Sequence, residues 1–210
     1  MRPEPLLNRA TQGTYRPGST YKPSVAVAGL AEGVIAPTET VYCGGIYTRF
    51  KDYQPGCLYV NGNINVVGAL QVSCNIFFYE TGWRLGIEKQ NEYSAHFGLG
   101  SKTGIELGEK EGQLSSPATQ EAGGQVWTDG NVIQSAIGQL DHLFTPVQMA
   151  GYVQTLADDG ERMQLHLIKS VKSYNFEETV EETEIQAVDH VPASKEVFQV
   201  VREGMTKATQ

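Results

Sequence analysis

The sequence predicts an α+β fold, and three observations lead to that class. Several segments repeat apolar residues at helical spacing and carry helix end signals, whereas one segment alternates in the manner of a half-buried strand. Glycine accounts for 23 of the 210 residues and divides the chain into short elements. Because helices bracket strands of the hairpin type, we expect an α+β arrangement.

The first helix is expected to run from Ser19 to Gly33. Ser19 can cap it, Pro23 lies in the first turn where a missing N–H costs little, and Gly33 provides the stop. Its apolar face consists of Val25, Ala28, Leu30 and Ala31.

The middle of the chain is predicted to be a loop followed by two apolar runs. Residues 43–63 are rich in Tyr, Pro and Gly and show no sustained period, which is typical of a loop. Asn65 can cap an apolar run over 66–72 that breaks near Ser73 and resumes from Asn75 to Gly86.

The last third carries clearer signals. Thr145-Pro146-Val147-Gln148 combines a cap, a proline at the first helical position and a capping box, and Gly160 ends the helix. Apolar residues then alternate with polar ones over 163–167, which predicts a strand. A final helix over 195–207 begins behind a Ser194 cap. It buries Val197, Phe198, Val201 and Met205.

Charge and hydropathy exclude several classes of protein. Sixteen basic against 24 acidic residues give a net charge of −8, so no nucleic acid is expected as a partner. The longest apolar stretch, residues 25–36, contains Glu32 and falls short of the roughly 18 residues of a membrane span. Residues 1–5 lack the pattern of a signal peptide. The acids concentrate in a segment expected to be a solvated loop or exposed strand: Glu177, Glu178, Glu181, Glu182 and Glu184.

Cysteine and histidine spacing does not predict a metal site. Cys43, Cys57 and Cys74 form no C-x-x-C pair, and the four histidines form no H-x-x-x-H. Cys43 and Cys57 flank a Gly/Tyr/Pro-rich segment and could close it with a disulfide, or both could remain free.

The chain contains one S-x-x-K motif, Ser19-Thr20-Tyr21-Lys22. On a helix this spacing puts a hydroxyl and an amine on one face, about 5–6 Å apart at Cβ. Such a pair can work as a nucleophile and its base if the pKa of the lysine is lowered. The alternative is a capping serine beside a solvated lysine.

The surrounding residues resemble a known family. Asn8-Arg9-Ala10 and the string from Tyr15 to Pro23 are similar to the active-site serine segment of class B penicillin-binding proteins, the D,D-transpeptidases that cross-link peptidoglycan. Ser73-Cys74-Asn75 fits the second motif of that family, S-x-N. Further similarity runs through Phe97–Gly100, Thr103–Ile105, Ala136–Gln139 and Thr145–Ala150, so that the resemblance covers nearly the whole chain.

The resemblance implies the fold of penicillin-binding proteins and serine β-lactamases, together with four site residues. Ser19 would be the nucleophile that attacks the carbonyl between two D-alanines, and Lys22 its base. Ser73 would relay a proton toward the leaving amine, and Asn75 would hold the backbone of the substrate. Peptidoglycan stem peptides and β-lactam antibiotics are the expected ligands. No metal or cofactor is expected.

The third motif of the family, K-T-G, is where the sequence departs. Lys102-Thr103-Gly104 belongs to a different landmark, and the catalytic K-T-G is expected after a helix that Val201–Met205 resembles. Residues 1–210 are therefore expected to be a partial transpeptidase domain that lacks sheet strands at both ends. Slow acylation or none is expected, because one oxyanion-hole amide would be missing. We also expect exposed apolar faces, and hence self-association or marginal stability. The parent protein would be anchored on the outer face of the bacterial cytoplasmic membrane.

Two other functions remain open. A catalytically silent domain could act only in binding, and a related D,D-carboxypeptidase or β-lactamase would keep Ser19 and Lys22 but use water to resolve the ester. Two further motifs are excluded: Ser101 interrupts a phosphate loop at Gly98–Thr103, and the acids around Gly160 lack the spacing of an EF-hand.

Overall fold

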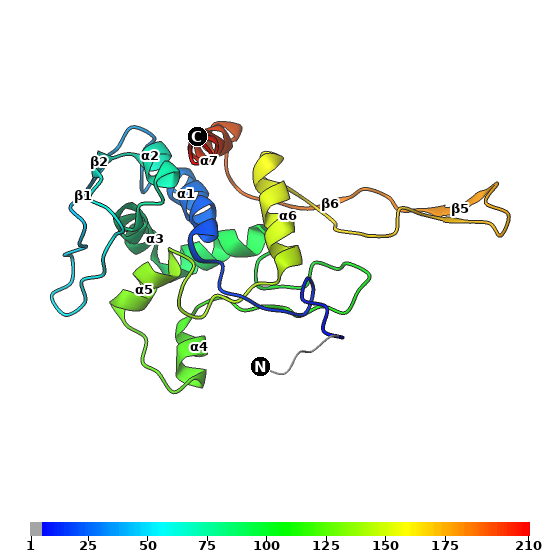
Figure 1. Ribbon diagram of the computed structural model, residues 1–210, viewed down its shortest axis with the longest axis horizontal. Helices are drawn as coiled ribbons and strands as arrows, with labels where there is room; N and C mark the ends of the chain where they lie inside the picture. Colours follow the sequence, from blue (N-terminus) through cyan, green and yellow to red (C-terminus); the bar gives the residue numbers. More distant parts are fainter. Residues whose placement is uncertain (1–5) are drawn as a thin grey trace.

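A helix that is buried on nearly all sides, α1 (Lys22–Ala31), occupies the centre of the computed structural model, which describes residues 6–210 (Figure 1). It continues a single 3-10 turn, η1 (Gly18–Tyr21), and every residue from Lys22 to Gly29 is buried. A helix that is apolar all round belongs in a core. α3 (Asn75–His96) and α7 (Lys195–Lys207) pack against it. The helix predicted between Ser19 and Gly33 is confirmed, with bounds Lys22–Ala31.

The predicted role of Ser19 as a helix cap is wrong. Ser19 lies within η1, and Tyr21, the N-cap residue of α1, makes no side-chain capping bond. The backbone N–H of Ser24 instead donates to the Tyr152 hydroxyl at 3.0 Å. A backbone N–H group in the first turn of α1 thus finds its acceptor on another helix. Local sequence cannot show such a contact between distant residues.

The break between the two central apolar runs is confirmed. α2 (Val66–Gln71) begins at Asn65, whose side chain accepts a hydrogen bond from Gly68 N at 3.0 Å. Ser73 then takes a left-handed φ of 53° and separates α2 from α3. α3 extends beyond the predicted end of its apolar run, because the chain bends at Gly86 (φ 72°) and continues as a helix to His96.

Three of the helices that follow begin with reciprocal capping boxes. α6 (Pro146–Ala157) starts at Thr145 and Gln148 as predicted. α4 (Pro117–Ala122) and α5 (Asp129–Ser135) were not predicted, since each has only six or seven residues and its box ends in Thr or Asn instead of Glu or Gln. The final helix α7 has the predicted bounds and buries Phe198 and Val201, while Val197 and Met205 are half-buried.

The strands form three separate antiparallel pairs. β1 (Val41–Cys43) pairs with β2 (Gly62–Ile64), so both ends of the predicted loop over 43–63 belong to a small sheet. β3 (Glu161–Met163) pairs with β6 (Ala187–His190), and β4 (Ser170–Lys172) with β5 (Thr179–Glu182). The strand predicted over 163–167 is wrong beyond Met163.

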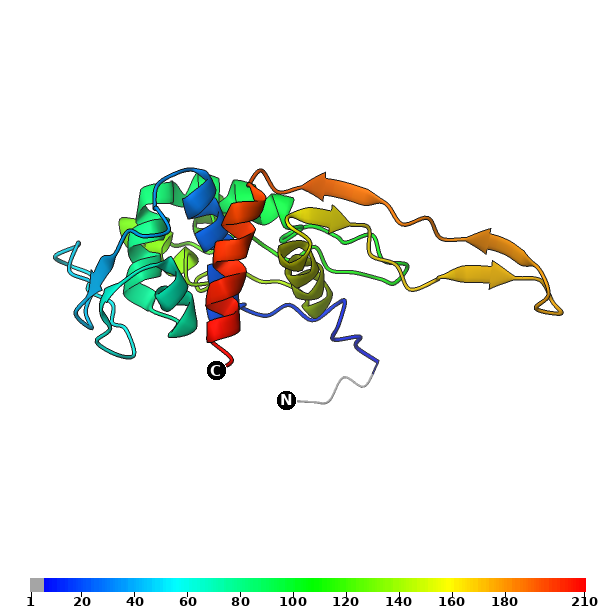
Figure 2. The same cartoon turned by 90° about the horizontal axis from the view of Figure 1, so that it is seen from above.

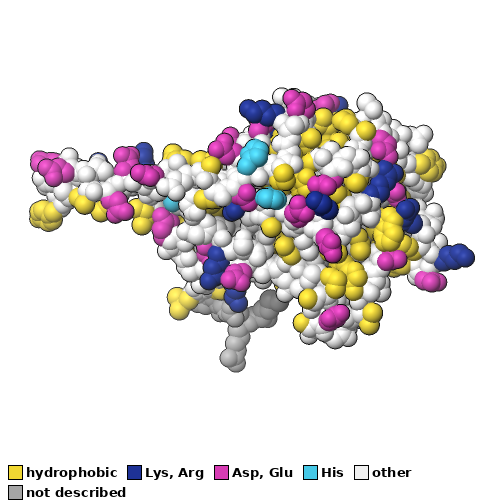
Figure 3. Space-filling model, turned by 180° about the vertical axis from the view of Figure 1, so that it is seen from behind, with side chains coloured by type: hydrophobic (Ala, Val, Ile, Leu, Met, Phe, Trp, Pro, Cys, Tyr) yellow, Lys and Arg dark blue, Asp and Glu magenta, His cyan; other side chains and the backbone are white. Residues whose placement is uncertain are grey.

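Residues 161–190, which contain the pairs β3–β6 and β4–β5, form an arm that projects away from the helices (Figures 1 and 2). Its acidic residues are exposed as predicted, and acidic and hydrophobic side chains lie together along it (Figure 3). The most exposed apolar side chains of the arm are Tyr174, Phe176, Val180 and Ile185.

Residues 1–5, on which the signal-peptide prediction rests, lie outside the described residues. Within residues 6–210, no helix is both long enough and apolar enough to cross a membrane.

Candidate functional site

The turn that carries Ser19 is held by a close contact between two glycine backbones. Gly18 (φ 56°) donates its N–H to the carbonyl of Gly138 at 2.9 Å. Gly138 itself has φ 70°, and a Cβ placed there would lie 2.2 Å from the Gly18 carbonyl oxygen. Only glycine fits this approach, so the loop after α5 sets the position of the Ser19 turn.

Tyr21 anchors the same turn in the core. Its ring is fully buried 4.6 Å from the ring of His142, and its hydroxyl lies 2.5 Å from Ser94 Oγ. Burial raises the pKa of Tyr21 to about 12, so the phenol stays protonated and able to donate. The residue that follows, Lys22, is thereby fixed in direction.

Lys22 is the buried cation of the site. Only 1% of its surface is exposed, and its ammonium group donates three hydrogen bonds. Nζ lies 2.7 Å from Ser73 O, 2.9 Å from Ser73 Oγ and 2.7 Å from Asn75 Oδ1. The ring of Phe78 lies 5.6 Å from Nζ. The amine of the S-x-x-K motif is thus joined directly to the S-x-N motif.

Burial makes Lys22 easier to deprotonate than a solvent-exposed lysine. Burial lowers the pKa of Lys22 to about 8, and the negative potential of Cys57 and Cys74 offsets only part of this effect. The three bonded oxygens are uncharged, and among residues 6–210 no carboxylate pairs with the amine. A lysine in this state can accept a proton near neutral pH.

Ser73 and Asn75 reach Lys22 because the chain turns between α2 and α3. Ser73 has φ 53°, and Asn75 is the first residue of α3. The Asn75 side chain also donates from Nδ2 to Gly56 O at 3.4 Å. Because the chain is not helical between them, Ser73 and Asn75 can point to the same side although they are two residues apart.

The structure thus brings together three of the four predicted site residues, Lys22, Ser73 and Asn75. Ser19 lies one turn before Lys22 with an exposed side chain, and its hydroxyl has no hydrogen-bond partner among residues 6–210. Its role as nucleophile stays a prediction.

Three cysteine thiols converge beside this site. Their sulfur atoms, in Cys43, Cys57 and Cys74, all lie within 4.8 Å of one another, and all three thiols are free. The disulfide that could have joined Cys43 to Cys57 is not formed. Thiolates are ligands that soft metal ions favour, so the spacing argument against a metal site missed this cluster. Cys57 lies 14 positions after Cys43 and 17 positions before Cys74, and such wide spacings form no local metal-binding motif.

The surroundings shift the pKa values of two of these thiols in opposite directions. Burial tends to raise the pKa of Cys57, but hydrogen bonds from the backbone of Tyr59, Asn75 and Ile76 lower it overall. Burial raises the pKa of Cys74 to about 12.

A buried serine and histidine pair lies behind the site and was not predicted. His142 Nδ1 accepts from Ser115 N at 3.2 Å, so its Nε2 carries the proton and donates to Ser135 Oγ at 2.7 Å. All three residues are fully buried. Burial lowers the pKa of His142 to about 3, which keeps the ring neutral. Sealed in this way, the pair is a structural contact.

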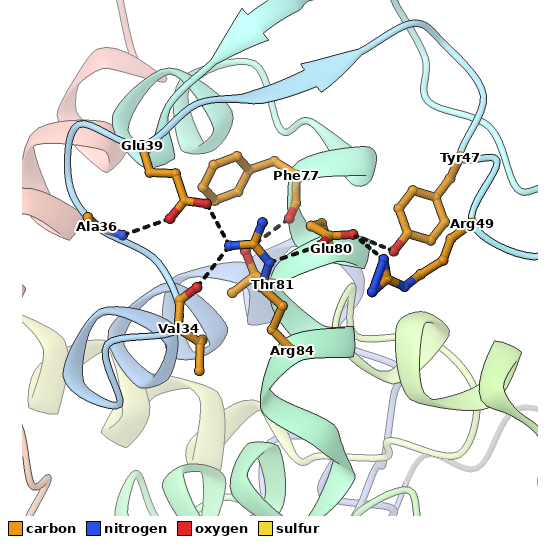
Figure 4. Close-up of polar contacts among 9 residues, drawn as sticks. All are labelled: Val34, Ala36, Glu39, Tyr47, Arg49, Phe77, Glu80, Thr81 and Arg84. Carbon is orange, nitrogen blue, oxygen red and sulfur yellow. Dashed lines mark hydrogen bonds and ion pairs between the residues drawn. The ribbon is translucent and has the colours of Figure 1, made fainter.

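An ion-pair network holds the loop after α1 against α3 (Figure 4). Arg84 donates to Glu39 at 2.6 Å, to Glu80 at 2.9 Å and to Val34 O at 2.9 Å. Glu80 also accepts from the Tyr47 hydroxyl at 2.8 Å. The network fixes both sides of β1, the strand that ends at Cys43.

The chain belongs to the family of penicillin-binding protein transpeptidase domains, whose family match covers residues 1–210. Among curated proteins it is 36% identical over 174 residues to peptidoglycan D,D-transpeptidase MrdA of Escherichia coli K12, which covers 79% of this chain and 27% of that protein. It is 26% identical over 216 residues to penicillin-binding protein H of Bacillus subtilis, and this match covers 93% of this chain and 29% of that protein. The chain thus spans under a third of the length of these relatives.

Solved structures agree with this assignment. Pseudomonas aeruginosa PBP2, solved in complex with WCK 5153, superimposes with a TM-score of 0.80 at 30% identity, over 96% of this chain and 46% of that one. Penicillin-binding protein A of M. tuberculosis, solved as an imipenem acyl-enzyme complex, gives a TM-score of 0.83 at 25% identity, over 97% and 46%. The predicted fold and membership of the class B penicillin-binding proteins are confirmed.

Proposed function

We propose that this chain carries the acylation centre of a peptidoglycan D,D-transpeptidase, in which Ser19 forms an ester with D-Ala-D-Ala stem peptides. The observation that carries the proposal is the buried Lys22 amine, bonded to Ser73 and Asn75 and shifted toward its neutral form. The names of the relatives, a peptidoglycan transpeptidase and a protein solved as an acyl-enzyme, support it.

Deprotonation of Lys22 would prepare the site for attack. The ammonium uses three N–H groups on three oxygens, whereas a neutral amine has two N–H groups and a lone pair. Loss of one proton therefore releases one oxygen and creates an acceptor. Ser19, one helical turn earlier, would give its proton to that lone pair as its oxygen attacks the carbonyl carbon.

Ser73 and Asn75 would complete the reaction. Ser73 Oγ, 2.9 Å from Lys22 Nζ, would pass the proton to the departing D-alanine amine. The 3.4 Å bond from Asn75 Nδ2 to Gly56 O is long, so the amide could turn to a substrate carbonyl. An amine of a neighbouring stem peptide would then resolve the ester and form the cross-link.

β-Lactams would acylate the same serine, and the parent protein would act on the outer face of the cytoplasmic membrane. The relative that was solved as an imipenem acyl-enzyme supports the acylation by β-lactams.

The test is intact-mass and peptide-mapping mass spectrometry after incubation with benzylpenicillin. We expect a slow adduct or none on Ser19 of this chain, and a fast adduct on Ser19 when the chain is extended by the carboxy-terminal segment of its Escherichia coli relative (the extended chain). Ser19→Ala should abolish the adduct, and Thr20→Ala, which alters the neighbouring exposed hydroxyl, should keep it. An adduct on another residue, or no adduct on the extended chain, would contradict the proposal. Release of the adduct by water at a catalytic rate would favour a hydrolase.

A further inference from the structure

The distal half of the arm carries most of the net charge of the chain. Residues 173–186 contain five glutamates and no lysine or arginine, so this segment holds five of the eight net negative charges. The arm projects away from the helices, and acidic and hydrophobic side chains lie together along it (Figures 1 and 3). A surface of this kind attracts a basic partner and repels nucleic acid and anionic lipid.

A cavity of about 190 Å³ lies where the arm meets the loop between α3 and α4. It is lined by two acidic, two aliphatic and two hydroxyl-bearing residues: Glu106, Glu181, Ile168, Val171, Ser170 and Thr183. The cavity corresponds to about six water molecules at about 30 Å³ each, which is roughly the volume of one long side chain.

Glu106 is held in place at the wall of this cavity. Its two carboxylate oxygens accept hydrogen bonds from the backbone N–H of Leu167 at 2.9 Å and of Ile168 at 3.2 Å. The bond from Leu167 is the main cause of a lowered pKa of Glu106, so the carboxylate is ionised at neutral pH. Within residues 6–210, neither Glu106 nor Glu181 forms an ion pair. Both carboxylates can therefore accept a cation from outside.

We propose that the arm binds an extended basic segment of another protein, and that a lysine or arginine side chain of this segment enters the cavity lined by Glu106 and Glu181. The hydrocarbon stem of that side chain would lie on Ile168 and Val171, which are 49% and 44% exposed. Its charged group would donate to the carboxylates. The cavity has no part in the proposed acyl transfer, so the inference does not rest on the proposed function.

The strands of the arm leave room for an extended partner. Among the described residues, β4 and β5 pair only with each other, so the outer edge of each has no strand beside it. An unpaired edge accepts an added strand through main-chain hydrogen bonds, and side-chain pockets then give specificity. Val180 and Ile185, 69% and 76% exposed, offer apolar contacts on the same arm.

Two other occupants fit the cavity less well. A hard divalent cation takes six or more oxygen ligands, whereas Ile168 and Val171 contribute hydrocarbon to the lining. A second copy of this chain carries a net charge of −8, so it is a poorer source of a basic segment.

The first experiment is calorimetric titration of the chain with the peptide acetyl-Thr-Val-Lys-Val-Arg-Val-Thr-amide (the basic peptide). We expect binding that weakens as sodium chloride is added, and no binding of a matched peptide with Glu in place of Lys and Arg. The Tyr174→Ser/Phe176→Ser variant, which changes the tip of the arm outside the cavity, should bind equally well. No binding of the basic peptide, or equal binding of the acidic one, would overturn the proposal.

The second experiment tests the cavity itself. Glu106→Gln and Glu181→Gln should each weaken binding of the basic peptide about fivefold, the loss expected for one partly exposed charge pair. Glutamine at position 106 keeps an oxygen for the backbone N–H groups of the arm. Glu178→Gln removes the same charge from the acidic segment outside the cavity and should weaken binding less than about twofold. Equal losses in the three variants would mean diffuse attraction without a pocket and would overturn the proposal.

The third experiment locates the bound peptide and tests the other occupants. Amide hydrogen exchange should slow over residues 168–183 and stay unchanged over residues 73–75 when the basic peptide binds. Protection confined to other segments would overturn the proposal. So would displacement of the peptide by calcium chloride beyond the effect of sodium chloride at equal ionic strength, which would assign the cavity to a metal ion. An oligomer of the chain alone that Glu106→Gln disperses would assign the cavity to a second copy and would likewise overturn it.

Discussion

The backbone N–H of Gly18 donates to the carbonyl of Gly138 at 2.9 Å, and this contact joins the turn of the candidate nucleophile to the loop after α5. A side chain at Gly138 would meet the Gly18 carbonyl at 2.2 Å. The position of Ser19 thus depends on a residue more than a hundred positions away in the chain.

Gly138→Ala should lower the free energy of unfolding by about 3 kcal/mol, because it adds a backbone clash to the strain of a left-handed alanine. The matched control is Gly124→Ala, with φ 71° and nothing within 4 Å of the added Cβ, where about 1 kcal/mol is expected. Urea unfolding measures both. Equal losses in the two variants would mean that the Gly18 contact is unimportant.

The rate of penicillin labelling of the extended chain should rise with pH and level off above about 8, the pKa to which burial lowers Lys22. The neutral amine is the base, and it predominates only above its pKa. Lys22→Met should abolish labelling. Lys102→Met, which changes the exposed lysine of Lys102-Thr103-Gly104, should leave the pH profile unchanged. A rate that falls between pH 7 and 9 would contradict the assignment of Lys22 as base.

His142 should make the chain less stable in acid. Burial lowers its pKa from 6.5 to about 3 in the folded chain, so between these values the unfolded state binds more protons. The free energy of unfolding therefore falls as the pH falls from 6.5 toward 3, and the full contribution is present above 6.5. His142→Gln should flatten this dependence, measured by thermal unfolding, and His166→Gln, at an exposed site, should not. An unchanged slope in His142→Gln would contradict the account.

Arg84→Met should free the loop between α1 and β1. The variant loses three contacts, to Glu39, Glu80 and Val34 O, and should cost about 1 kcal/mol because the ion pairs are partly exposed. Limited proteolysis within residues 34–40, which hold Val34 and Glu39, should become faster. Lys89→Met, which removes two ion pairs on the same helix away from this segment, is the control. Equal proteolysis of both variants would count against the anchoring role of Figure 4.

The exposed apolar side chains of the arm should promote self-association. Tyr174 and Phe176 at its tip are 101% and 77% exposed. A Tyr174→Ser/Phe176→Ser double variant should shift the chain toward monomer in light scattering after gel filtration. A wild-type chain that is monomeric with a sharp thermal transition would remove the basis for this prediction.

Local signals carried most of what the sequence could predict. Asn65 and Thr145 cap the helices assigned to them, and Ser73 marks the break between α2 and α3, because these effects lie within one turn of chain. The motif residues Lys22, Ser73 and Asn75 could also be predicted, because residue type and spacing within each motif identify them. The contact between the two motifs is not local and was not predicted from spacing.

Pairing across long separations was the part that could not be predicted. β1 and β2 have three residues each and exist through their contact with one another, so the segment looked like a loop. The three thiols and the Gly18–Gly138 contact likewise join distant segments. The residue type of Ser19 predicts a helix cap, but Ser19 lies within η1. The contact between Gly18 and Gly138 fixes this turn.

The Lys22 amine, bonded to Ser73 and Asn75, is proposed to activate Ser19. The most direct test is to identify, by peptide mapping, the residue that carries the penicilloyl group after the extended chain reacts with benzylpenicillin. We predict an adduct on Ser19 alone, lost in Ser19→Ala and in Lys22→Met. A modified residue other than Ser19, or full labelling in Lys22→Met, would contradict the claim.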